Sequence, residues 1–137
     1  MLFDTHQYRQ AGNVVAHQLA AMKEHEALLI KMADMVTDGL IALRNKDYLA
    51  FGQLLEDSWF MKRELSPYVS TPEIDGIYEA AIRAGARGGK LLGAGGGGFI
   101  LFFVELEKQE AVKAALNELT YVPFKFETEG SVVLYRD

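Results

Sequence analysis

Apolar residues recur at helical spacing over the first third of the chain. From Asn13 to Arg44 they are separated by alternating steps of about three and four residues, and Glu26 interrupts the series. The members of this stripe are Val15, Leu19, Met22, Leu29, Ala33, Val36, Leu40 and Leu43. The pattern predicts one long amphipathic helix. The sequence RNKD then predicts a turn, with Asp47 as the N-cap of a second helix over residues 48–65. Helices joined by so short a turn are expected to pack antiparallel.

Turn chemistry separates these helices from a predicted sheet. In SPYVSTPEID, Thr71 and Pro72 are typical of an N-cap and a first helical residue, and the helix should run to about Ala84 with Gly85 as its C-cap. Strands are predicted over 90–92, 99–105, 122–127 and 131–135, and an amphipathic helix over 107–119. The order α-α-α-β-β-α-β-β favours an α+β fold. We expect a four-stranded antiparallel, ferredoxin-like sheet with helices on one face, preceded by the antiparallel helical pair.

Composition narrows the class of protein. The chain has 137 residues, which suits one domain with a real core. Its net charge of −5 argues against a general nucleic-acid binder. There is no cysteine, so neither a disulfide nor a thiolate metal site can form. No apolar run is long enough to span a bilayer and no signal peptide is visible, so we expect a soluble, cytoplasmic domain without a membrane partner.

The densest feature of the chain is the glycine run in GGKLLGAGGGGFILFFV, residues 88–104. Six small residues stand between two apolar segments: Gly93, Ala94, Gly95, Gly96, Gly97 and Gly98. Three of them fit the spacing G-x-G-x-x-G, but a strand follows where a dinucleotide site needs a helix, so that site is rejected. The nucleotide-binding pattern that ends in Gly-Lys-Ser/Thr fails as well, because Leu91 follows Lys90.

Two interpretations of the glycine run remain open. The first is a β-hairpin loop, although a hairpin needs only one or two glycines. The second is a loop that another backbone or a ligand approaches closely, where successive exposed N–H groups could bind an anion. Arg83, Arg87 and Lys90 precede the loop and would favour an anion. A solvated helix end explains Arg83 better than it explains Lys90.

These residues resemble a known family. The glycine run is similar to the third conserved motif of the GHMP kinases, which include galactokinase, homoserine kinase and mevalonate kinase. The flanking residues Trp59, Lys62, Pro72, Ile74 and Asp75 resemble the branch that contains D-glycero-D-manno-heptose 7-phosphate kinase. VPFKFETEGSVV is similar to the C-terminal end of that branch, so the resemblance covers nearly the whole chain.

The resemblance implies a C-terminal kinase domain over residues 1–137. In the family the ATP-binding loop and the catalytic Asp lie in an N-terminal domain, and no segment here matches them. The resemblance therefore implies one half of an ATP-dependent sugar or sugar-phosphate kinase, in which loop 93–98 forms one wall of the phosphoryl-transfer site. The full-length enzyme would use ATP and Mg²⁺, and neither is expected to bind this chain alone. The implied substrate contacts are Trp59, Lys62, Arg87, Lys90 and Arg9.

The implied partners are the missing N-terminal domain and the sugar substrate. The face left uncovered by that domain is expected to be apolar and could pair with a second copy as a homodimer. We expect Leu28, Met32 and Met35, which lie off the main stripe, to contribute to it.

Other interpretations were weighed against this one. A ferredoxin-like regulatory module could capture a small molecule with the glycine loop, but such modules usually begin with a strand and this chain is predicted to begin with helices. A pure assembly domain is a third class. HEALL resembles the start of a zinc-binding helix but has Leu29 in place of the second His, so no metal site is predicted. Trp59 could equally be a core residue.

Overall fold

The computed structural model describes residues 1–8 and 11–135. Along the chain the elements are β1 (Leu2–Asp4), α1 (Ala11–Ala20), α2 (Glu26–Arg44), α3 (Tyr48–Glu64), α4 (Pro72–Arg83), β2 (Gly88–Leu91), β3 (Phe99–Phe103), the 3₁₀ turn η1 (Leu106–Lys108), α5 (Gln109–Ala115) and β4 (Thr120–Val122). No helix in the described ranges is long and apolar enough to cross a membrane.

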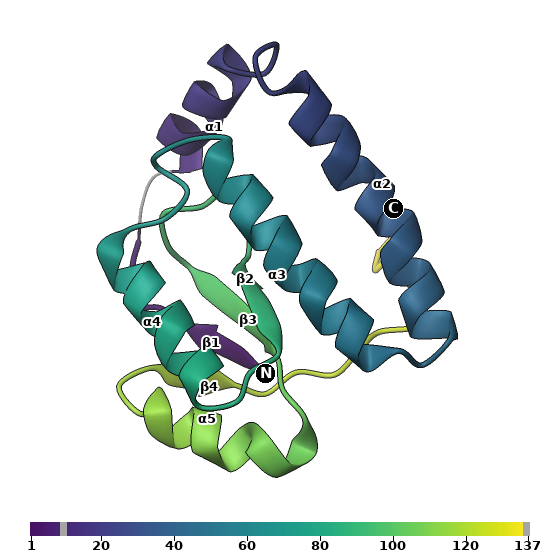
Figure 1. The fold of residues 1–137 in the computed structure, drawn as a ribbon, viewed down its shortest axis with the longest axis vertical. Coiled ribbons are helices and arrows are strands. Elements are labelled where there is room, and N and C mark those ends of the chain that lie inside the picture. Colours follow the sequence, from purple (N-terminus) through teal and green to yellow (C-terminus); the bar gives the residue numbers. More distant parts are fainter. Residues whose placement is uncertain (9–10, 136–137) are drawn as a thin grey trace.

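The strands form one antiparallel sheet in the order β2-β3-β1-β4. Phe3 in β1 lies opposite Ile100 in β3 and Tyr121 in β4, so the first strand of the chain is an inner strand of the sheet. Helices α3 and α4 lie over one face, with α5 at the lower end of the same layer (Figure 1). The predicted α+β fold with a four-stranded antiparallel sheet is therefore confirmed.

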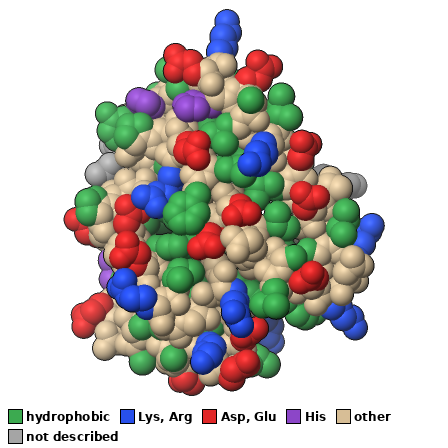
Figure 2. Space-filling model, in the orientation of Figure 1, with side chains coloured by type: hydrophobic (Ala, Val, Ile, Leu, Met, Phe, Trp, Pro, Cys, Tyr) green, Lys and Arg blue, Asp and Glu red, His purple; other side chains and the backbone are tan. Residues whose placement is uncertain are grey.

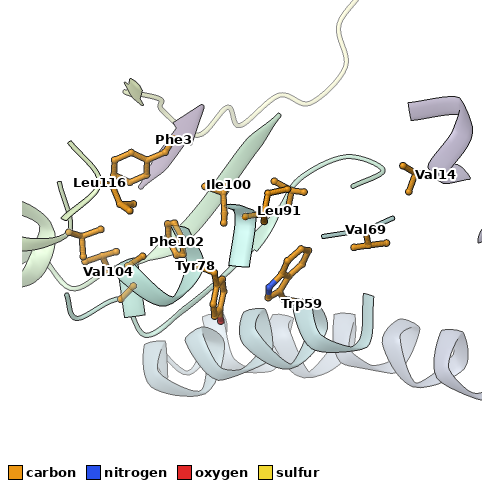
Figure 3. Packing of buried hydrophobic residues seen from close by; sticks show 14 residues of the cluster. Phe3, Val14, Trp59, Val69, Tyr78, Leu91, Ile100, Phe102, Val104 and Leu116 are labelled. Atoms are coloured by element: carbon orange, nitrogen blue, oxygen red, sulfur yellow. The ribbon is translucent and has the colours of Figure 1, made fainter. Parts of the chain in front are cut away.

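The core lies between this face of the sheet and helices α3, α4 and α5. Figure 3 shows the apolar side chains that meet there. The sheet contributes Phe3, Leu91, Ile100 and Phe102, the helices contribute Trp59, Ile74, Tyr78 and Val112, and Leu116 follows directly after α5. Each of these large side chains stabilises the fold by about 1.5–3 kcal/mol when it is fully buried. Helix α2 packs on α3, and Ala42 is its one buried residue.

The first strand was not predicted. The expected order began with helices, whereas the chain begins with β1. Only three residues make the strand, which is too short for an alternating pattern to appear, and both of its partner strands lie about a hundred residues away in sequence. The objection that a regulatory module should begin with a strand therefore does not apply.

The single helix predicted from Asn13 to Arg44 is wrong. The structure has α1 and α2 with a tight turn at residues 21–25 between them, and Figure 1 shows the chain changing direction there. No Gly or Pro lies in this turn. Glu26, which interrupts the apolar stripe, is the first residue of α2 and was the one sequence signal of the break.

The strands predicted at the C-terminus are also wrong. Only Thr120–Val122 pairs in the sheet, and residues 123–135 carry no strand. Val132, Val133 and Leu134 are exposed, and none of residues 131–135 pairs with a strand of the sheet. The helix predicted over 107–119 is replaced by η1 and the shorter α5.

The helix starts predicted at Asp47 and Thr71 are confirmed. The Asp47 carboxylate accepts the Ala50 N–H at 3.0 Å, and the Thr71 hydroxyl accepts the Ile74 N–H at 3.3 Å. Each bond satisfies one of the free N–H groups of a first helical turn. The predicted antiparallel pair is formed by α2 and α3 (Figure 1).

Candidate functional site

The glycine loop joins β2 to β3. At its neck the Leu92 N–H donates to the Phe99 carbonyl at 2.8 Å. All five glycines have positive φ angles, from +73° at Gly93 to +154° at Gly97. Residues with a Cβ rarely adopt these conformations, so the backbone path of the loop requires glycine.

Hydrogen bonds fasten the loop to two distant segments. The Gly96 N–H donates to the Val69 carbonyl at 2.9 Å, in the connection between α3 and α4. The Gly98 N–H donates to the Gln7 carbonyl at 2.8 Å, after β1. The Gly98 carbonyl accepts the backbone N–H and the hydroxyl of Thr5, at 2.8 and 2.7 Å. The loop is therefore part of the packed structure rather than a free hairpin tip.

The chain's own backbone approaches two of the glycines very closely. A Cβ on Gly95 would lie 2.8 Å from the Val69 Cα, and a Cβ on Gly97 would lie 2.7 Å from the Gln7 carbonyl carbon and still closer to its oxygen. Real Cβ atoms do not approach other atoms this closely. The expectation that a backbone comes close to the loop is thus met within this chain, and a simple hairpin does not explain the glycines.

Four amides of the loop are left without an acceptor. Among the described residues, nothing accepts the N–H groups of Gly93, Ala94, Gly95 or Gly97. Gly95 is buried, so its N–H has little access to bulk water. Successive N–H groups in such a loop form a concave site for an anion, because each carries a partial positive charge and has no competing partner.

Two lysines lie beside this loop. The Lys62 Nζ, from α3, donates to the Leu91 carbonyl at 3.3 Å and to the Gly93 carbonyl. The Lys90 Nζ, from β2, donates to the Ser58 hydroxyl at 2.6 Å. The four ion pairs of the described chain include neither lysine. Burial and the like charge of Lys90 lower the pKa of Lys62 to about 8, and burial also lowers the pKa of Lys90.

These lysines predict that stability rises with pH above 8. The ordinary pKa of Lys62 is 10.5, so between pH 8 and 10.5 the unfolded chain binds more protons than the folded chain. The free energy of unfolding must then increase with pH in that window. Urea unfolding should show that the free energy of unfolding increases less between pH 8 and pH 10 in Lys62→Met than in the wild type. The upper limit is chosen because burial raises the pKa of Tyr78, which opposes the trend above pH 10. Equal slopes for both proteins would contradict the prediction.

Two other predicted substrate contacts, Trp59 and Arg87, make their contacts away from the loop. Trp59 is fully buried in the core, where it packs on Tyr78. Its indole N–H has no partner among the described residues. Arg87 lies at the opposite end of β2 and pairs with Glu105 at 3.1 Å. Arg9 lies outside the described residues.

Sequence analysis missed the residues that hold the loop in place. They are Thr5, Gln7, Val69 and Gln18, whose amide group donates to the Ala94 carbonyl at 3.4 Å. The Thr5 hydroxyl and its acceptor at Gly98 are 93 residues apart in sequence. No local pattern marks such pairs, so the sequence carried no signal for them.

A further cavity lies apart from the loop. It has a volume of about 320 Å³, lies between α3 and α4, and includes no loop residue. Its charged and hydroxyl groups pair with one another: Arg63 with Asp75, Arg83 with Glu79, and the Tyr78 hydroxyl with Glu56. Within the described ranges no cluster of His, Asp and Glu could hold a metal ion.

The predicted apolar surface comes from different residues than expected. Met32 and Met35 line a groove against α3, and Leu28 is half-buried. The more exposed apolar side chains are those of the main stripe, at Val15, Leu19, Met22, Val36, Leu40 and Leu43, and the last three of these line the same groove as Met32 and Met35. Figure 2 shows apolar side chains spread between charged ones over this part of the molecule. These exposed apolar side chains on α1 and α2 make this part of the molecule the candidate for an interaction surface.

Comparison with protein families matches residues 40–122 to the model described as GHMP kinases C terminal. The chain is 34% identical over 141 aligned residues to the D-glycero-alpha-D-manno-heptose 7-phosphate kinase of Campylobacter jejuni, covering 95% of this chain and 40% of that protein. It is 39% identical over 77 residues to a galactokinase of Mycobacterium bovis, covering 56% of this chain and 21% of that protein.

A solved structure shows the same fold. The mevalonate kinase of L. major, in complex with R-mevalonate, superposes with a TM-score of 0.73 at 22% identity, covering 85% of this chain and 37% of that one. The chain thus spans at most two fifths of the length of these relatives.

Proposed function

This chain belongs to the GHMP kinase family, and from that premise we propose that it is the substrate-side half of an ATP-dependent sugar or sugar-phosphate kinase. The observation that carries the proposal is the glycine loop, whose amides at Ala94 and Gly95 have no acceptor while the loop is fixed on every side. The two curated relatives are named as kinases of a sugar and of a sugar phosphate.

The loop amides would face the phosphates during transfer. Phosphoryl transfer depends mostly on positioning and on stabilising charge on the phosphate oxygens. Donors that are already fixed cost no reorganisation when that charge develops. The residues fit a phosphate, because the amides of Ala94 and Gly95 are unpaired and two lysines lie nearby. ATP with Mg²⁺ would supply the phosphoryl group, and we place the metal ligands and the nucleotide loop on the missing N-terminal half.

The acceptor would lie on the same side of the loop. Lys90 is the predicted substrate contact that the geometry favours, because its half-buried ammonium has only a neutral hydroxyl as partner. An anionic group on the acceptor, such as the phosphate of a sugar phosphate, would complement it. Trp59 and Arg87 are less favoured as substrate contacts, because Trp59 is buried in the core and Arg87 pairs with Glu105.

The exposed stripe on α1 and α2 is proposed as a contact surface for the rest of the enzyme. In the absence of that half, a second copy of the chain could cover it as a homodimer. Sedimentation at increasing concentration would report that pairing, and replacing Leu40 by Lys should abolish it without affecting the core, because Leu40 is 47% exposed.

The chain alone is expected to show no kinase turnover. The purified chain would be incubated with Mg·ATP and either galactose or a heptose 7-phosphate, and also fused behind the N-terminal part of the Campylobacter jejuni relative. We expect no product from the chain alone and steady product from a folded fusion. Turnover by the chain alone, or a folded fusion inactive on both substrates, would contradict the proposal. Tight binding of a small ligand by the chain alone would instead support a regulatory module.

A further inference from the structure

We propose that Lys62 is a positioning residue: its ammonium holds the peptide groups at the start of the glycine loop so that the Ala94 N–H points away from α3. The inference deepens the function proposed above, because those amides are its phosphate donors. It differs from the interpretation of Lys62 as a substrate contact, which the sequence suggested.

The contacts of Lys62 are made to the loop itself. Its Nζ donates to two carbonyls, that of Leu91 at the end of β2 and that of Gly93 inside the loop. An ammonium has three N–H donors, so two of the three are committed. No carboxylate pairs with Lys62 in the described part of the chain. The two carbonyls are therefore the groups that compensate its half-buried charge.

Because a peptide unit is planar, a hydrogen bond that fixes its carbonyl also fixes the direction of its N–H group. In a planar trans peptide, the C=O and the N–H of one unit point in opposite directions. The unit of Leu91 and Leu92 shows this in the structure: its carbonyl accepts from Lys62 on one side, and its N–H donates to Phe99 on the other. By the same geometry, a Gly93 carbonyl held by Lys62 turns the Ala94 N–H away from α3.

The next peptide unit is held in a similar way. The Gln18 side chain, from α1, donates to the Ala94 carbonyl at 3.4 Å, which turns the Gly95 N–H away from α1. The remaining anchors of the loop, at Val69, Gln7 and Thr5, are neutral groups that act on Gly96 and Gly98. Lys62 is thus the charged anchor at the part of the loop whose amides are unpaired.

Lys62→Met tests this on the chain as it exists. Methionine keeps an unbranched apolar side chain and removes the donors. We expect the ¹⁵N order parameters of residues 93–95 to fall from the rigid value of about 0.85 to below about 0.6. The matched control is Lys90→Met, since Lys90 is similarly half-buried but bonds Ser58, and it should leave residues 93–95 ordered. Lys62→Arg keeps N–H donors and should restore part of the order.

Unchanged order parameters at residues 93–95 in a folded Lys62→Met would overturn the proposal, as would an equal loss in Lys90→Met. If Lys62→Met does not fold, the wild-type ammonium decides the question by ¹⁵N detection of Nζ. Slow proton exchange and restricted rotation of the Lys62 ammonium would support its role in holding the loop. Free rotation of the ammonium would overturn it.

The active fusion separates this role from that of a substrate contact. A positioning residue should lower kcat and leave KM for the sugar nearly unchanged, whereas a substrate contact should raise KM. The order parameters are measured without ATP or sugar, so they can support the positioning role of Lys62 even if the fusion is inactive. An inactive fusion with an ordered, Lys62-dependent loop would count against the proposed function alone.

Discussion

Gly97→Ala is expected to destabilise the chain by about 3 kcal/mol, within the range of overpacked sites. The new Cβ would meet the Gln7 carbonyl oxygen and lie 2.7 Å from its carbon, and both are backbone atoms. The backbone cannot move aside freely, because the Gln7 carbonyl accepts the Gly98 N–H and Thr5 bonds the Gly98 carbonyl. Either the loop or the segment after β1 must therefore separate. Urea unfolding would measure the loss of free energy.

The matched control is Gly93→Ala in the same loop. Gly93 also has a positive φ, of +73°, but a Cβ there would meet nothing within 4 Å. Its cost is then conformational strain alone, on the order of 1–2 kcal/mol. If Gly97→Ala lowers the free energy of unfolding by no more than Gly93→Ala does, the close approach of Gln7 is contradicted.

The glycine run shows what sequence can and cannot reveal about a site. Its density correctly indicated that something comes close to the loop, because glycine is costly wherever a Cβ would be tolerated. The sequence could not say what comes close. The backbones at Val69 and Gln7 are ordinary in sequence and become neighbours of the loop only through the tertiary fold.

The fold was predictable where patterns are local. Helices α3 and α4 have strong caps at Asp47 and Thr71, and their starts were predicted correctly. Strand β1 depends on partners far away in sequence, and its three residues carry no periodicity of their own. The C-terminal segment shows the opposite failure. The apolar residues at 131–135 resemble a strand, but a strand needs a neighbour, and they pair with neither edge of the described sheet.

Helix α2 explains why the apolar surface was assigned to the wrong residues. Met32, Met35, Val36 and Leu40 all line the groove with α3, but Met32 and Met35 are half-buried whereas Val36 and Leu40 are exposed. A periodic stripe indicates which residues share a face but not which face the core covers. Only the packing of α3 decides how deeply each of these residues is buried.

A second large effect is expected at Gly88, outside the loop. A Cβ on Gly88 would meet the Gly52 carbonyl oxygen of α3 and lie 3.0 Å from the carbonyl carbon. Gly52 is itself buried, and a Cβ there would lie 3.0 Å from the Arg87 Cβ. Helix α3 thus packs backbone against backbone on β2. Gly88→Ala should cost about 3 kcal/mol, because the helix must move away from the strand.

Gly76→Ala is the control for this substitution, because Gly76 lies in α4 and a Cβ there meets nothing within 4 Å. Alanine is the better helix former, so that change should stabilise the chain by up to about 1 kcal/mol. Thermal and urea unfolding of both variants would give the difference in their free energies of unfolding. If Gly88→Ala lost no stability, the packing of α3 on β2 would be contradicted.

The effect of Gly88→Ala should extend to the loop, because α3 carries Lys62 and a displaced helix would withdraw the ammonium from the Gly93 carbonyl. Residues 93–95 should therefore lose order in Gly88→Ala, which would tie the glycine before the loop to the function of the glycines within it.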